Sequence, residues 1–263
     1  MHILAAILAA GFALSAIMAL AWWVQRRTGN SGWIDAIWTF GTGFVAAGLA
    51  LYPLTGESVP WRQALVAAMA TGWALRLGWH IVGRTRLDHD DPRYAAIMKD
   101  WGADAPRRLF RFLQAQAAVA LVLAASVAVA AHRPAADWDV VDLLAGSIFL
   151  GGWLIEAISD RQLRKFKQNA APGSVCNLGL WSWSRHPNYF GEWLCWCAYP
   201  LLALRFDYPI GLAALIGPVI LYLTLVYASG IPPLEAHMRR SRGTVWSDYA
   251  ARTSAFFPLP PRA

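Results

Sequence analysis

The chain has 263 residues, of which 57% are apolar and only 15% are charged, and its mean hydropathy is +0.37. This composition excludes an ordinary soluble domain and predicts a membrane protein with several spans. The net charge of +7 is also typical of nucleic-acid-binding proteins. Here the basic residues fall in loops between apolar runs, where membrane topology accounts for them, so no nucleic-acid partner is predicted.

Apolar runs near the length needed to cross a bilayer, about 20 residues, occur seven times. They are Ile3–Val24, Trp33–Tyr52, Trp61–Gly83, Phe112–Ala131, Val140–Ile158, Tyr189–Leu204 and Pro209–Ser229. The first run lacks the basic start and the cleavage site of a signal peptide, so we expect it to be a retained helix. The sequence predicts one all-α membrane domain, 1–263, with seven transmembrane helices.

Basic residues alternate between the predicted loops. Most of the 23 arginines and lysines lie in segments 25–32, 84–111, 159–188 and after 229. The other loops hold only Arg62, Arg133 and Arg205. With seven spans all the basic segments fall on one side, which the positive-inside rule makes cytoplasmic. The N-terminus is then outside and the C-terminus is cytoplasmic, so we expect the protein to span a membrane that borders the cytoplasm.

Ionisable side chains inside the spans gather toward the predicted cytoplasmic half. They form helical stripes at intervals of four residues, which places each stripe on one helix face. The stripes are Arg76, His80 and Arg84; Glu156, Asp160 and Arg164; and Asn188 with Glu192, while Asp35 opens the second span. Charged residues in spans are costly and usually functional. We therefore expect a water-accessible pocket open to the cytoplasm, and no such groups in the extracellular half.

The segment Gly179–Glu192 has the densest set of polar side chains. Its sequence is Gly-Leu-Trp-Ser-Trp-Ser-Arg-His-Pro-Asn-Tyr-Phe-Gly-Glu. Pro187 suits the first turn of a helix, and helix N-termini bind phosphate or carboxylate groups. We expect an anionic cofactor at this helix start, contacted by the polar residues Arg185, His186, Asn188, Tyr189 and Glu192. The cysteines, Cys176, Cys195 and Cys197, lack zinc or redox spacing, so no metal site is predicted.

Several of these residues also have simpler structural interpretations. Asp35 suits a helix cap, because acidic residues favour first turns. Arg76 and Glu192 are able to form a buried structural pair. His80 fits the interior of a helix bundle, and the remaining polar candidates fit a solvated tail or packing. These remaining residues are Glu235, His237 and Tyr249.

Taken together, the motifs resemble the steroid 5-alpha-reductase family, and most closely its bacterial branch of uncharacterised membrane proteins. The likeness rests on Leu180–Glu192, Asp35–Trp38, Trp73–Arg84, Asp91–Tyr94, Ser159-Asp160 with Gln162–Arg164, and Tyr249–Pro258. It implies a seven-helix reductase that uses NADPH to reduce a carbon–carbon double bond conjugated to a ketone in a lipophilic substrate from the bilayer. The Arg-His-Pro-x-Tyr portion alone also resembles isoprenylcysteine and phospholipid methyltransferases, which bind S-adenosylmethionine.

The resemblance also implies roles for individual residues. Cofactor contacts would come from Arg76, Arg84, Asp160, Arg164, Arg185, His186, Asn188, Tyr189, Glu192, Glu235, His237 and Tyr249. Animal members polarise the substrate ketone with a glutamate and a tyrosine. Here the corresponding positions hold Asp35 and Trp73, and tryptophan is a poor acid. Asp35 kept protonated by burial, with Trp73 and His80, is the expected catalytic set.

Three functions remain open from the sequence. The first is the NADPH-dependent reductase acting on a lipid-like enone. The second is a methyltransferase that uses S-adenosylmethionine to modify a lipid or an isoprenylcysteine. The third is a lipid-binding membrane protein without enzymatic activity, against which the charged residues inside the spans argue, because a scaffold has no need to keep Arg76 and Glu192 in lipid.

Overall fold

The computed structural model describes residues 2–53, 60–87, 90–134 and 137–262. Most of these residues are helical, and within them β-structure is limited to isolated bridges such as the one between Ser184 and Ser254. The all-α prediction is therefore confirmed. The chain separates into two compact units: unit 1 comprises Met1–Asp139 and Tyr199–Gly217, and unit 2 comprises Val140–Ala198 and Pro218–Ala263.

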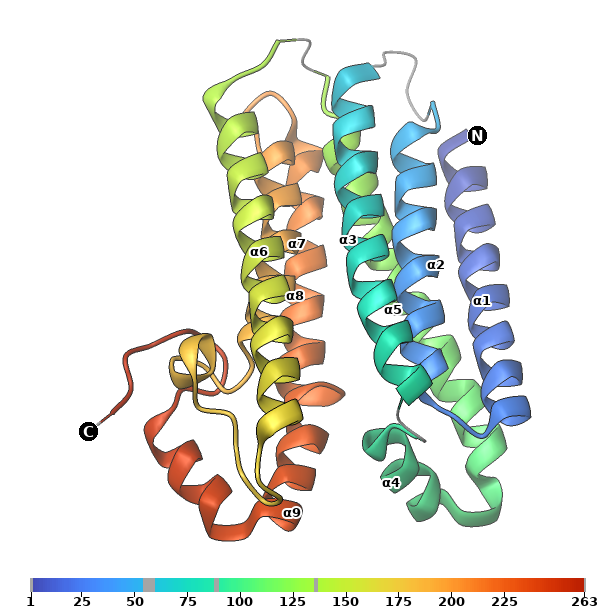
Figure 1. Ribbon diagram of the computed structural model, residues 1–263. Helices are drawn as coiled ribbons and strands as arrows, with labels where there is room; N and C mark the ends of the chain where they lie inside the picture. The colour runs from blue at the N-terminus through green and yellow to red at the C-terminus, as the bar shows by residue number, and fades with distance from the viewer. Residues whose placement is uncertain (1, 54–59, 88–89, 135–136, 263) are drawn as a thin grey trace. The chain divides into compact units, whose positions relative to one another are not determined.

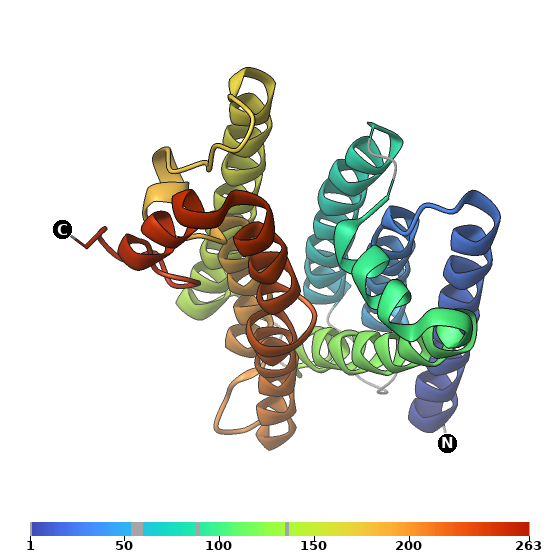
Figure 2. The same ribbon diagram turned by 90° about the horizontal axis from the view of Figure 1, so that it is seen from below.

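Unit 1 contains four long helices and one short one (Figure 1). They are α1 (His2–Thr28), α2 (Gly32–Leu51), α3 (Pro60–Leu87), α4 (Pro92–Trp101) and α5 (Ala105–Ala131), with the 3-10 turns η1 (Gly102–Asp104) and η3 (Pro209–Leu215). Figure 2 shows the short α4 lying across the end of this unit. Leu14, Ile34, Tyr94 and Leu113 are among the buried side chains that pack α1, α2, α4 and α5 together.

Small residues bring α2 and α3 into close contact. Gly43 has no room for a side chain, because an added Cβ would overlap the Cβ of Ala74 and lie 3.0 Å from the carbonyl oxygen of Ala70. Such close approach is typical of membrane helices, where dispersion contacts replace hydrophobic burial as the force between helices. The second and third helices therefore pack nearly backbone to backbone.

Unit 2 contains the remaining helices. They are α6 (Val140–Asn169), η2 (Gly179–Ser182), most of α7 (Pro187–Ala203), α8 (Ile216–Leu223), the π-helical turn η4 (Thr224–Ala228) and α9 (Ile231–Arg252). Here glycines again set the contact. A Cβ at Gly191 of α7 would lie 2.6 Å from the backbone nitrogen of Glu156, and one at Gly152 of α6 would lie 2.8 Å from that of Cys195. The middle of α6 and the start of α7 are thus held against each other.

Among the residues that the structure describes, six helical segments are long and apolar enough to cross a membrane. They are Ile3–Thr28, Gly32–Leu51, Trp61–Arg86, Arg93–Ala131, Val140–Asn169 and Pro209–Arg252. The chain is therefore a polytopic membrane protein. The predicted span Tyr189–Leu204 corresponds to α7, which has 17 residues and hence a length of about 25 Å, a little short of a hydrocarbon core of about 30 Å.

Several predicted boundaries were wrong, because hydropathy marks the membrane-length core of a helix and not its polar continuation. The predicted loop 84–111 contains the end of α3, all of α4 and the start of α5. The fifth predicted span ends at Ile158, but α6 continues to Asn169. The C-terminal tail contains α9, which starts with prolines in its first turn and bends at Gly243, where φ is 54°.

The prediction that the half opposite the basic loops has no buried charges was also wrong. At that end of unit 1, Arg62 is 0% exposed and Arg133 is 1% exposed. The Nη1 atom of Arg62 donates to the carbonyl oxygen of Arg133 at 3.2 Å, and Nη1 of Arg133 donates to that of Leu202 at 2.8 Å. Carbonyl groups at helix ends lack intrahelical partners, so these two arginines satisfy them and stabilise the end of the unit.

The α2–α3 contact makes a direct prediction. We expect Gly43→Ala to lower the free energy of unfolding by about 1–3 kcal/mol, because the methyl group forces the two helices apart. Gly48→Ala on the same helix is the matched control, since nothing lies within 4 Å of its added Cβ, and alanine favours a helix more than glycine does. Thermal unfolding of both variants in detergent tests this, and equal stability of the two would contradict the close contact.

Candidate functional site

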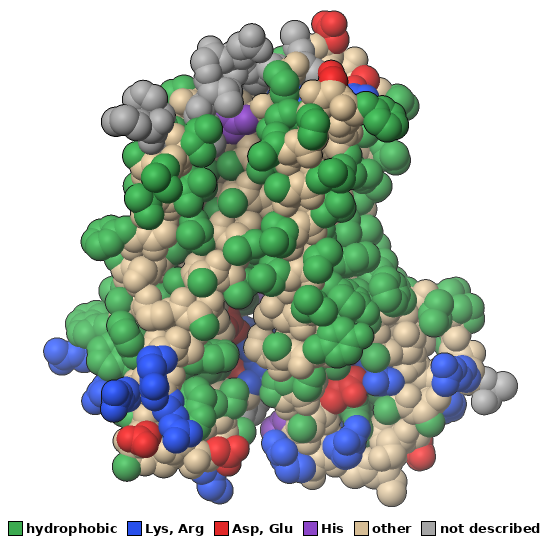
Figure 3. All heavy atoms as spheres, turned by 180° about the vertical axis from the view of Figure 1, so that it is seen from behind, with side chains coloured by type: hydrophobic (Ala, Val, Ile, Leu, Met, Phe, Trp, Pro, Cys, Tyr) green, Lys and Arg blue, Asp and Glu red, His purple; other side chains and the backbone are tan. Residues whose placement is uncertain are grey.

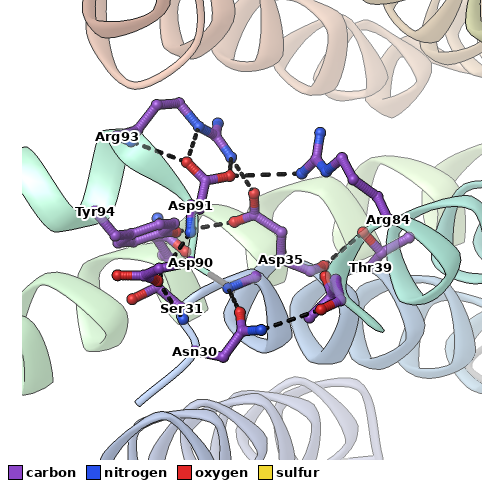
Figure 4. Close-up of polar contacts among 12 residues, drawn as sticks. Asn30, Ser31, Asp35, Thr39, Arg84, Asp90, Asp91, Arg93 and Tyr94 are labelled. Atoms are coloured by element: carbon purple, nitrogen blue, oxygen red, sulfur yellow. Dashed lines mark hydrogen bonds and ion pairs between the residues drawn. The ribbon is translucent and has the colours of Figure 1, made fainter. Parts of the chain in front are cut away.

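Asp35 is the centre of a polar network in unit 1 (Figure 4). Its carboxylate accepts hydrogen bonds from the hydroxyl of Tyr94, at 2.9 Å, and from the guanidinium of Arg93. Asp35 lies in the first turn of α2, while Arg93 and Tyr94 lie in the first turn of α4. These contacts fasten α4 to the start of α2. Asp35 does lie in the first turn of α2, where a capping residue is expected. The partners of its side chain, Arg93 and Tyr94, however, belong to α4.

Asp91 extends this network toward α3. It caps the N-terminus of α4 by accepting from the backbone N–H of Arg93 at 3.0 Å, and it forms an ion pair with the Arg93 side chain at 2.8 Å. Arg84 of α3 lies 3.5 Å from the same carboxylate. Burial alone would raise the pKa of Asp91, but the hydrogen bonds and charge of Arg93, together with the charge of Arg84, hold it below its ordinary value. Asp91 is therefore an ionised link between α3 and α4.

The predicted residues of α3 lie on one side of that helix with different exposure. Trp73 is fully buried and packs edge-on against Trp38 of α2, with ring centroids 6.4 Å apart. Arg76 and His80 are half-buried, and the side chain of Arg84 is 41% exposed. The structure thus places Trp73, Arg76, His80 and Arg84 in a series that runs from the interior of unit 1 to its surface.

Unit 2 contains a second set, made of carboxylates. Glu156, Asp160 and Glu192 are 2%, 5% and 7% exposed. Glu156 lies on α6 and Glu192 lies on α7, the two helices that approach each other closely at Gly152 and Gly191. Arg164, the next member of the predicted α6 stripe, is exposed. The stripe is therefore interior at its first two positions and reaches solvent at the third.

The motif residue Arg185 is used to hold unit 2 together. Its Nε and Nη2 atoms donate to the two carboxylate oxygens of Glu235, at 2.7 and 3.1 Å. Its Nη1 atom donates to the carbonyl oxygens of Ala250 and Thr253, at 3.0 and 2.6 Å. These four bonds use four of the five N–H donors of the guanidinium. Only one donor remains, so Arg185 has little capacity to bind a phosphate. We call Arg185, His186 and Glu235 the clasp.

His186 completes the clasp from the start of α7. Its Nε2 atom lies 3.0 Å from Glu235, and its ring stacks on Tyr189 with centroids 5.5 Å apart. Burial lowers the pKa of His186, against the opposing effect of Glu235, so the imidazole is neutral near pH 7. The clasp fixes how the chain enters α7, beside the half-buried Asn188.

Two predicted residues of α9 have different surroundings. Tyr249 is buried, and its hydroxyl donates to the carbonyl oxygen of Trp181 at 2.6 Å, which ties α9 to η2. This contact favours a packing role for Tyr249. His237 is half-buried on the first half of α9.

Comparison with known proteins gives one match. The matching family model is described as "Protein of unknown function (DUF1295)", and it covers residues 21–253. The chain belongs to this family. A search of curated proteins finds no match. The matched region includes both the Asp35 network and the clasp, so both lie within the part of the chain that defines DUF1295 membership.

Sequence reasoning missed some residues that the structure brings together. The sequence predictions assign no site role to Arg93 or Tyr94, although both belong to the Asp-Pro-Arg-Tyr motif at 91–94. Glu156 was named as a buried charge without a place among the cofactor contacts. The signal that would have found Arg93 and Tyr94 is an N-cap aspartate followed by proline, which predicts a helix start inside a presumed loop.

The Asp35 network predicts how α4 is held. Arg93→Gln removes the charge shared by Asp35 and Asp91, and we expect amide hydrogen exchange across Pro92–Trp101 to become about 10- to 100-fold faster, equivalent to about 1.4–2.8 kcal/mol. Arg108→Gln, at an exposed position of α5, is the control and should leave this exchange unchanged. Identical exchange in the two variants would show that the network does not fasten α4.

The clasp predicts a difference between arginine and lysine. Arg185→Lys keeps the positive charge but loses the planar fork that contacts Glu235 and two carbonyl groups. We expect it to lower the free energy of unfolding by about 2–4 kcal/mol, measured by chemical denaturation in detergent. Arg240→Lys, at an exposed position of α9, should change it by less than about 0.5 kcal/mol. A negligible effect of Arg185→Lys would argue against a structural role.

Proposed function

We propose that this protein is an NADPH-dependent membrane reductase that transfers a hydride to the carbon–carbon double bond of a lipophilic enone. The observation that supports this best is the buried carboxylate set of unit 2, Glu156, Asp160 and Glu192. Ionisable side chains buried in membrane helices are expensive and are kept mainly where function requires them. The resemblance of the Leu180–Glu192 motif to steroid 5-alpha-reductases supplies the class of reaction.

The donors and acceptors present suit a dinucleotide. Carboxylates accept hydrogen bonds from ribose hydroxyls and from the nicotinamide amide, and Asp160 and Glu192 are the residues proposed for this. Guanidinium groups bind phosphate with bidentate geometry, which is the role that the resemblance implies for Arg76 and Arg84 of unit 1. We do not assign phosphate binding to Arg185, because Glu235 and two carbonyl groups use most of its N–H donors. When bound, NADPH supplies the hydride.

The network around Asp35 changes the part proposed for that residue. Its carboxylate accepts from Tyr94 and Arg93, so we assign it to positioning α4 and not to donating a proton. Trp73 and His80 remain the proposed substrate-contacting residues of α3. Trp73 is 1% exposed, and such buried aromatic surface excludes water, which protects a hydride transfer.

We also propose the topology that the basic loops predict. In it α7 also crosses the membrane, as the sixth of seven spans, the N-terminus lies outside, and the C-terminus lies in the cytoplasm of a bacterial cell. The segments with the most arginine and lysine then share the cytoplasmic side, and a helix somewhat shorter than the bilayer core is accommodated by local thinning of the bilayer. NADPH, a cytoplasmic cofactor, would reach the protein from that side.

Nucleotide binding tests the proposal directly. The purified protein in lipid nanodiscs is titrated with NADPH and, in parallel, with S-adenosylmethionine, and binding is measured by calorimetry. NADPH binding followed by NADPH oxidation with a lipophilic enone is the expected result. Binding of S-adenosylmethionine alone would replace the proposal with a methyltransferase, and binding of neither would support a lipid-binding protein without a cofactor.

The role of Asp160 gives a sharper prediction. Asp160→Asn should raise the Kd for NADPH about 10- to 100-fold, because a charge-assisted hydrogen bond contributes about 1.5–3 kcal/mol. Asp248→Asn, at an exposed position of α9, is the control and should bind as the parent does. Thermal unfolding without nucleotide shows whether the Asp160 variant is folded. A folded Asp160 variant with unchanged affinity would remove this residue from the cofactor site.

A further inference from the structure

The segment that follows α9, residues 254–262, has no helix but is firmly fastened to unit 2. The backbone N–H of Arg185 donates to the carbonyl oxygen of Ser254 at 2.8 Å, and the Ser184 hydroxyl donates to that of Phe256 at 2.8 Å. The N–H of Leu259 donates to the carbonyl oxygen of Trp183 at 3.0 Å. The side-chain directions of this segment are therefore set by the fold and are not those of a loose tail.

Three apolar side chains of this region are nevertheless held outward. Trp183, Phe257 and Leu259 are 46%, 44% and 53% exposed, whereas the neighbouring Phe256 is 4% exposed. We call these three residues the apolar rim. Burying a large apolar side chain stabilises a protein by about 1.5–3 kcal/mol, so a rigid backbone that presents three of them needs something to cover them. In Figure 3 the C-terminal segment lies at the lower right. Hydrophobic side chains gather on the upper part of this edge, and charged side chains lie below them.

The apolar rim continues the surface of the spanning helices of unit 2. The ring of Phe257 lies 5.8 Å from that of Trp193 on α7 and 6.1 Å from that of Tyr222 on α8, centroid to centroid. On α8 and the turn after it, Val219, Leu223 and Tyr227 are exposed, as expected of a lipid-facing surface. The rim is thus continuous with the exposed apolar face of a segment that is long and apolar enough to span a membrane.

Basic residues lie beside the rim. The N–H of Arg262 donates to the carbonyl oxygen of Arg252 at 2.9 Å, and both arginines are exposed. Aromatic side chains favour the level of lipid headgroups, and each basic residue near an anionic membrane surface contributes about 1 kcal/mol of attraction. The combination of aromatic, apolar and basic residues is that of an interfacial membrane anchor.

We propose that segment 254–262, together with Trp183, inserts its apolar rim into the headgroup region of the bilayer and contacts anionic phospholipid. The clasp is tied to the same segment, since the backbone N–H of Arg185 donates to the carbonyl oxygen of Ser254. Membrane contact of the rim therefore fixes the clasp, and the start of α7 that it holds, at a defined depth. This inference does not depend on the proposed reductase activity.

A fluorescent probe at Leu259 tests the anchor. In a variant with alanine at Cys176, Cys195 and Cys197, Leu259→Cys is labelled with an environment-sensitive fluorophore and placed in nanodiscs of phosphatidylglycerol and phosphatidylcholine. Lipids with a quencher near the headgroup should quench this probe about twofold or more strongly than a probe at Ser247→Cys, an exposed position of α9. Unchanged thermal unfolding shows that the labelled variants are folded.

Two further arms decide between occupants of the rim. Quenching at Leu259 should fall in discs of phosphatidylcholine alone, and Arg252→Gln with Arg262→Gln should lower it to the same level in the mixed lipid. Equal quenching at Leu259 and Ser247 would overturn the proposal. Quenching that does not respond to the two arginines would overturn the anionic contact. Protection of Leu259 only in discs with two copies of the chain would replace the bilayer with a second copy as the occupant.

Discussion

A bilayer cannot solvate a charge, so each buried charged side chain in this protein must be given its partners by the protein itself. The structure meets this constraint in two ways. Carboxylates and guanidinium groups pair across helix starts, as Asp35 does with Arg93, and arginines bind the carbonyl groups that helix ends leave unsatisfied, as Arg133 does at Leu202. The charged side chains thereby connect helix ends, and apolar and small residues pack the helix middles.

Close helix packing is what allows such charges to stay in place. Where α6 meets α7, Gly191 lies against the backbone of Glu156. The Glu156 side chain therefore begins at a helix contact that leaves no room for water. Close-packed interiors resist rearrangement, and a charge fixed there keeps its orientation without a flexible loop. The glycines therefore contribute to the chemistry of the candidate site indirectly, by determining which backbones are adjacent.

The sequence predicted the helical class, the apolar cores of the helices and the buried carboxylates Glu156, Asp160 and Glu192, because hydropathy and the cost of charge in lipid are local properties. It failed where tertiary contacts decide. The chain has 21 glycines, and nothing in their spacing separates Gly43, where an added Cβ would overlap Ala74, from Gly48, where an added Cβ would meet nothing within 4 Å. Similarly, α4 was hidden because its polar helix depends on Asp35, 58 residues away from Arg93.

The number of donors on an arginine decides which arginines remain for a ligand, and sequence motifs do not count them. Arg185 stands in the densest motif of the chain, yet four hydrogen bonds to Glu235, Ala250 and Thr253 occupy it. Arg84, in a less crowded stretch, is 41% exposed and lies 3.5 Å from Asp91. A phosphate would find more unused donors at the second arginine than at the first. The Arg-His-Pro motif is therefore engaged within unit 2, where its bonds to α9 set the start of α7 and with it the position of the buried Glu192.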